Sequence, residues 1–87
     1  MFDDETPVAW TNLSLDTPVV TAGGAEIGTT EEVIGDQSAD IFHGLAVKRS
    51  SDGSVVELPA ARIKKMTKRH ILTDLAEADA ASLTRRR

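Results

Sequence analysis

The side chains that could support acid–base or metal chemistry are few and widely separated along the chain. There are two histidines, His43 and His70, and no cysteine. A tetrahedral metal site needs three or four ligands, so carboxylates from elsewhere would have to complete one. His43 follows Phe42 in a segment that we expect to be a strand, where a packed or surface position is favoured over a ligand or a base. We therefore expect neither a metal ion nor a cofactor.

Carboxylates and hydroxyls do not form a catalytic pattern either. Glu31 and Glu32 are adjacent in an expected strand, so their side chains would point to opposite faces of the sheet. The serines of 50–54 are turn residues with no histidine nearby in sequence, and no serine has the Gly-x-Ser-x-Gly pattern of a nucleophile elbow. The glycine pair 23–24 is too short for a phosphate-binding loop. The sequence therefore predicts a protein that is not an enzyme.

A basic cluster in the second half of the chain is the clearest chemical signal. It consists of Lys64, Lys65, Lys68 and Arg69, with three more arginines at 85–87. Such clusters can contact the phosphate backbone of RNA or DNA. Against this function, the chain has no tyrosine and few aromatic residues on which bases could stack, and its net charge is −4. We favour pairing with acids across neighbouring strands, each pair contributing roughly 0.2–1 kcal/mol; the acids are Glu26, Glu31, Glu32 and Asp36.

The charge is divided sharply between the two halves of the chain. Residues 1–46 carry a formal charge of −9 with no lysine or arginine, whereas residues 47–87 carry +5. The halves could therefore pair within one fold, or one half could face a partner. A third possibility is a two-fold homodimer in which the acidic face of each copy meets the basic face of the other. Apolar residues would have to supply the affinity, and the candidates are Trp10, Phe42, Met66 and Leu75.

Short β-like segments separated by turn residues must position these side chains. Apolar and β-branched runs predict six strands, at 18–21, 26–34, 41–49, 55–58, 62–67 and 70–73. The glycines at 23 and 24 suit a tight hairpin, and Asp52-Gly53 predicts a two-residue hairpin turn. Gly28 predicts a bend or bulge. At Gly44 we expect the alternation to shift, so that Phe42 faces inward before it and Leu45 faces inward after it. A helix over 63–72 is the alternative, but the regular strand spacing favours an all-β small barrel.

The two ends of the chain differ from this pattern. Residues 1–12 form an expected flexible acidic arm, with Trp10 docking on the outer surface of the domain. The spacing of Asp74 and Glu77 is that of a capping box, and the alanine-rich run to Leu83 predicts a short C-terminal helix. Its thin apolar face would consist of Leu75, Ala78 and Leu83, and the arginines at 85–87 would follow its C-terminal end.

The segment 18–72 resembles the PRC-barrel family in the order of its parts. These are Val19-Val20-Thr21 with a glycine turn, Glu26-Ile27-Gly28, Val33-Ile34 before an acidic loop, Leu45-Ala46-Val47, an Asp-Gly hairpin, Val56-Glu57-Leu58-Pro59, and Arg62-Ile63. The resemblance implies a small β-barrel that acts as a non-catalytic adaptor for other proteins, and free-standing members are often dimeric. It implies no catalytic residue in this chain.

Length and composition set the remaining expectations. Eighty-seven residues suffice for one domain, and a core this small favours added burial through dimerisation. The acidic start of the chain, with no apolar run after it, predicts neither a signal peptide nor membrane insertion. Small secreted domains often depend on disulfides, so the lack of cysteine favours the cytoplasm. The expected organisation is an arm at 1–12, a barrel at 13–73, and a helix with a basic tail at 74–87.

Two residue sets complete the expectation. The expected core consists of Val20, Ile27, Val33, Ile41, Leu45, Val47, Val56, Leu58, Ile63, Met66, Ile71 and Leu72. The expected function is a self-associating protein-interaction module, most simply a homodimer, with RNA or ribosome binding through the basic half as the alternative. The candidate partner surface consists of Trp10, Phe42, Lys64, Lys65, Met66, Lys68 and Arg69.

Overall fold

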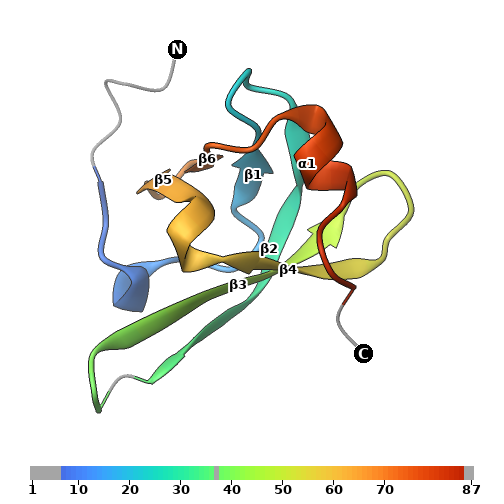
Figure 1. The fold of residues 1–87 in the computed structure, drawn as a ribbon. Helices are drawn as coiled ribbons and strands as arrows, with labels where there is room; N and C mark the ends of the chain where they lie inside the picture. Colours follow the sequence, from blue (N-terminus) through green and yellow to red (C-terminus); the bar gives the residue numbers. More distant parts are fainter. Residues whose placement is uncertain (1–6, 37, 86–87) are drawn as a thin grey trace.

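The computed structural model describes residues 7–36 and 38–85, and its fold is mainly β (Figure 1). Its six strands are β1 (Pro18–Val20), β2 (Glu26–Asp36), β3 (Ile41–Arg49), β4 (Val55–Pro59), β5 (Ile63–Met66) and β6 (Ile71–Thr73). Two single-turn 3-10 helices, η1 (Trp10–Asn12) and η2 (Ala60–Arg62), and one α-helix, α1 (Glu77–Ala81), accompany them. The predicted all-β class, six short strands and short C-terminal helix are confirmed. No helix in the described ranges is long and apolar enough to cross a lipid bilayer.

The strands form one mixed sheet in the order β4-β3-β2-β1-β6-β5. All neighbours are antiparallel except β1 and β6, which are parallel. The segment 63–72 is therefore two strands joined by a turn, and the helical alternative is excluded. The end strands β4 and β5 are linked by η2, and the described residues show no ladder between them. The sheet is thus a curled, partly open barrel.

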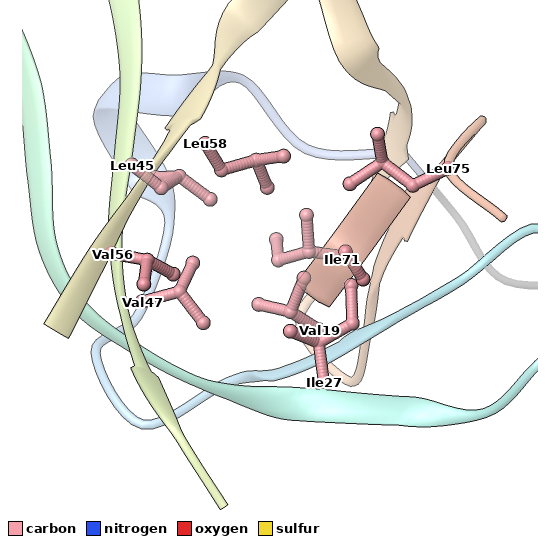
Figure 2. Packing of buried hydrophobic residues seen from close by; sticks show 9 residues of the cluster. Val19, Ile27, Leu45, Val47, Val56, Leu58, Ile71 and Leu75 are labelled. Atoms are coloured by element: carbon pink, nitrogen blue, oxygen red, sulfur yellow. The ribbon is translucent and has the colours of Figure 1, made fainter. Parts of the chain in front are cut away.

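The core lies inside this curl, where the two halves of the sheet face each other (Figure 2). Side chains of β1, β2 and β6 point toward those of β3 and β4, and Leu75 lies beside them. The buried cluster consists of Val19, Ile27, Leu45, Val47, Val56, Leu58, Ile71, Leu75 and Ala80. Expected core members Val33, Ile63 and Met66 pack against it while only half-buried.

Three core assignments need correction. Leu72 was expected in the core, but it is only half-buried and lies outside the buried cluster. Ile41 was expected in the core, but it is 47% exposed because it lies at the far end of the β2–β3 hairpin, opposite Asp36. Val19 is fully buried although the alternation placed only Val20 inward. Val19 pairs with the core residue Ile71 and shares its face of the sheet, whereas Val20 pairs with Leu72 outside the cluster. On β2, Ile27 is an extra residue, because Val19 pairs with Gly28 and Val20 with Glu26. This irregularity beside Gly28 confirms the expected bulge.

Another register shift lies in β3, within the β2–β3 hairpin. Ile34 pairs with Gly44 and Gly35 with Phe42, so His43 is the extra residue on its strand. The expected phase change at Gly44 is confirmed, because Phe42 packs on the core from one side of the shift and Leu45 is fully buried on the other. The backbone φ of Gly44 is +149°, and a Cβ there would overlap the carbonyl oxygen of Leu58.

The expected capping box is wrong. The helix begins at Glu77, and Asp74 instead pairs its Oδ1 with Nε of Arg62 at 2.8 Å. Residues before the helix stay extended because Leu75 is held on both sides: its N–H donates to Oγ1 of Thr73, and its carbonyl accepts from the N–H of Ala22. The apolar face shifts accordingly, since Ala80 is buried and the expected Ala78 is exposed.

The Asp-Gly turn forms the expected hairpin, but its loop is longer than two residues. Lys48 and Val55 are the last paired residues, and the N–H of Arg49 donates to the carbonyl of Ser54. The Asp52 carboxylate accepts from both the N–H and the hydroxyl of Ser54. These hydrogen bonds stabilise a loop of four residues. The two-residue turn that the sequence predicted could not form them.

The positive φ of Gly44 and its closeness to Leu58 lead to a prediction about stability. Gly44→Ala should lower the free energy of unfolding by about 3 kcal/mol, because the added Cβ meets both a disfavoured φ and a backbone oxygen. Gly53→Ala is the matched control: φ is +73° there, but nothing lies within 4 Å of the new Cβ, so only about 1 kcal/mol should be lost. Urea unfolding followed by circular dichroism measures both. Equal losses would contradict the overlap at Gly44.

Candidate functional site

A surface groove of about 320 Å³ lies between β5, η2 and the start of β3. We call it the seam groove; it is lined by Pro7, Phe42, Ala60, Ile63, Lys64, Lys65 and Met66. Four residues of the expected partner surface are therefore brought together: Phe42, Lys64, Lys65 and Met66. The groove combines apolar side chains with two cations, Lys64 and Lys65.

Phe42 reaches the groove from β3 and is braced from behind by Trp10. The two rings are stacked, with centroids 5.5 Å apart and planes 17° from parallel. Trp10 also lies on Gly35, where an added Cβ would stand 2.8 Å from the indole. Trp10 is half-buried on the hairpin and does not line the groove. Docking on the outer surface of the domain is what the sequence predicted for it, and here it supports Phe42.

The segment before η1 forms one end of the groove. The N–H of Val8 donates to the carbonyl of Met66 at 2.8 Å, and Pro7 bridges Thr67 in an antiparallel sense. Thus Pro7 and Val8 extend the β5 side of the sheet by a short stretch. Residues 1–6 of the expected acidic arm lie outside the described residues, and the flexibility of the arm stays a prediction.

The wall contributed by β5 has one exposed side chain among half-buried ones. Ile63 and Met66 pack against the core, whereas Lys64 is exposed. Lys64 falls at a register shift, because Ile63 pairs with Thr73 and Lys65 with Leu72. A residue left over in this way bends the strand locally. The result is an exposed ammonium group beside an apolar floor.

Lys68 and Arg69 belong to the following turn rather than to the groove. Oγ1 of Thr67 accepts hydrogen bonds from the N–H groups of Arg69 and His70, at 3.1 and 3.0 Å. This closes the turn between β5 and β6 and leaves the side chains of Lys68 and Arg69 exposed. The expected partner surface is therefore divided into a groove, a bracing tryptophan and a basic turn.

The expected cross-strand pairing of charges is wrong. β1 and β6 lie between the acidic β2 and the basic β5, so Lys64 and Lys65 have no cross-strand neighbour on β2. Ion pairs of the structure include Arg62 with Asp74 and Asp79, and Arg85 with Asp52 at 3.5 Å. All are exposed, and such pairs contribute at most about 1 kcal/mol each. Arg86 and Arg87 lie outside the described residues.

The acidic counterpart of the groove is the end of the β2–β3 hairpin. We call Asp36, Asp40 and Ile41 the hairpin tip. Oδ1 of Asp36 accepts from the hydroxyl of Ser38 at 2.7 Å, and from the N–H groups of Ser38 and Ala39. The hydroxyl hydrogen bond is the largest cause that lowers the pKa of Asp36 below its usual value, so the carboxylate keeps its charge in mildly acidic solution.

The two histidines stay apart. His43 is exposed on β3, beside a hollow of about 220 Å³ that is also lined by Glu57 and Pro59. His70 lies in the turn between β5 and β6. In the described parts of the chain, no group of three or more histidine, aspartate or glutamate side chains could hold a metal ion.

Sequence reasoning missed three residues of the groove. Ile63 was assigned to the core alone, and Pro7 and Ala60 were assigned no role. The proline after Leu58 marked the end of β4, but nothing in the sequence indicated that Ala60 would face β5. Comparison with known proteins adds no assignment, because no protein-family model and no curated protein matches the chain. The groove is therefore the basis of the function proposed below.

The ring stack can be tested by a double-mutant cycle. Trp10→Ala and Phe42→Leu should each destabilise the fold, and the pair should show a coupling free energy of about 1 kcal/mol because each single change already removes the stack. Urea unfolding followed by circular dichroism gives the four stabilities. Trp10→Ala with Val55→Ala is the control, since Val55 pairs at the opposite end of β3. Additive effects of Trp10 and Phe42 would contradict the stack.

Proposed function

We propose that this protein is a non-catalytic protein-interaction module that associates with further copies of itself and uses the seam groove as its binding surface. The observation that carries the proposal is the meeting of Phe42, Met66 and Lys64 in one groove. Aromatic residues and methionine are enriched where protein interfaces are buried, and charges at the rim fix orientation. A PRC-barrel-like adaptor, as the sequence suggests, is the corresponding family-level proposal.

Self-association is supported by what the surface exposes. Among the described residues, Ile41 at the end of the β2–β3 hairpin is a large apolar side chain that is 47% exposed. Basic residues line the groove, while the exposed acids Glu31, Asp36 and Asp40 lie along the β2–β3 hairpin. A surface that carries both signs in separate places can complement a second copy of itself. The proposed setting is the cytoplasm, in keeping with the lack of cysteine.

The proposal is tested by measuring mass against concentration. Light scattering over the micromolar range should show the mass rising from one chain toward two, and added salt should reverse the rise. Lys64→Glu should raise the dissociation constant about tenfold, because it places a carboxylate at the mouth of the groove. Lys48→Glu, the same change on an exposed residue of β3 outside the groove, should have little effect. A wild-type protein that stays strictly monomeric would contradict self-association.

A second candidate function is binding to a nucleic-acid backbone. One observation favours it: Lys68 and Arg69 are exposed on one turn, close in sequence to the exposed Lys64, and β2 is not the neighbouring strand. Cations in this arrangement can contact successive phosphates. The stacked pair of Trp10 and Phe42 weakens the case, because the two rings pack on each other.

This candidate predicts a salt-sensitive interaction. Fluorescence anisotropy of a labelled single-stranded RNA should rise at low salt and fall as salt increases, with a slope reduced by the double change Lys68→Glu and Arg69→Glu. Arg85→Glu, a cation paired with Asp52 at the other end of the sheet, serves as the matched control. No binding at low salt would end this candidate and leave the protein-interaction proposal untouched.

A further inference from the structure

We propose that the occupant of the seam groove is the hairpin tip of a second copy, so that two copies exchange tips reciprocally in a two-fold dimer. This inference rests on the proposed function and specifies its partner. It is carried by three features of the described residues: the chemistry of the tip, the way the tip is held, and the position of the tip beside the groove.

The chemistry of the tip complements that of the groove. Asp36 and Ile41 are cross-strand partners, and Asp40 directly precedes Ile41. An exposed branched aliphatic side chain is therefore flanked by two carboxylates. The groove offers the opposite set, with an apolar floor of Phe42, Ile63 and Met66 and the exposed ammonium group of Lys64. Apolar contact would supply affinity, and the charges would select orientation.

The tip is held in place before any partner arrives. The Asp36 carboxylate accepts three hydrogen bonds from Ser38 and Ala39, which tie Asp36 to the residues just before Asp40. Asp40 has a φ of +53°, a conformation that aspartate tolerates better than most residues. Behind the turn, Trp10 lies on Gly35 and stacks on Phe42. A segment that is already ordered loses less conformational entropy on docking.

The position of the tip makes a reciprocal contact geometrically simple. Ile41 belongs to the tip and the next residue, Phe42, lines the groove, so the two surfaces share a boundary on β3. Figure 1 shows the β2–β3 hairpin extending away from the rest of the sheet, with its turn at the outer end. A two-fold axis close to this boundary would place each tip against the groove of the other copy, and every contact would occur twice.

Two variants test the exchange, one on each surface. Ile41→Lys removes the apolar contact and places a cation against the basic groove, and Lys64→Glu places an acid against the acidic tip. Each alone should raise the dissociation constant of the homodimer about tenfold or more. In an equimolar mixture the heterodimer keeps one native contact, and its other contact pairs Lys at 41 with Glu at 64. Sedimentation velocity should therefore show dimer in the mixture at concentrations where each variant is monomeric.

Matched changes outside the tip and groove serve as controls. Leu15→Lys makes the same change at the other exposed aliphatic residue, and Lys48→Glu reverses an exposed charge elsewhere on β3. Both should leave association as in the wild type, and thermal melts verify that all variants are folded. If Lys64→Glu weakens the dimer while Ile41→Lys does not, or if the mixture stays monomeric, the tip exchange is overturned and the groove remains the binding surface. A monomeric wild type would overturn both.

Discussion

The fold depends on apolar contacts made across the inside of a single curled sheet. Val19 and Ile71 on one half of the sheet face Val47 and Leu58 on the other (Figure 2). A flat six-stranded sheet could not bring these side chains together, so the sheet has to bend. The register shifts beside Gly28 and at Gly44 occur where β1 meets β2 and where β2 meets β3. Bulges of this kind increase twist and redirect strands, and the core that results holds the two halves together.

The same curl generates the seam groove. Since β4 and β5 do not pair with each other in the described chain, η2 bridges them and the space beside β5 is left as a groove. The outer edges of both end strands are covered only in part. Thr84 accepts the N–H of Glu57 on β4, and Val8 donates to Met66 on β5. Short segments that cover the edge of a sheet in this way reduce unspecific pairing with other strands. In the proposed function, the groove is then the place where side-chain chemistry determines what binds.

Local patterns predicted the strands and the shift at Gly44, because alternation and turn residues act over a few positions. They did not predict where distant segments would meet. Asp74 has the spacing of a helix cap, yet Arg62 from η2 binds it and the burial of Leu75 keeps the chain extended. Ile41 looks like a core residue, but it lies beyond the strands that would cover it. The sequence predicted which residue types form the candidate site. It did not predict that Phe42 would lie beside β5, because that depends on how the whole sheet curls.

The order of the strands also determines where the acidic and basic halves of the chain lie in the sheet. Had β2 and β5 been neighbours, the acids and cations would have neutralised each other within the sheet. With β1 and β6 between them, the acids extend along the hairpin and Lys64 stands in the groove. The pairs of Arg62 with Asp74 and of Arg85 with Asp52 both join residues of the second half. Keeping opposite charges apart on one small surface costs little folding stability, because exposed ion pairs add little to the free energy of unfolding. The proposed contact between two copies would use this arrangement, because acids on the hairpin of one copy could meet Lys64 of the other.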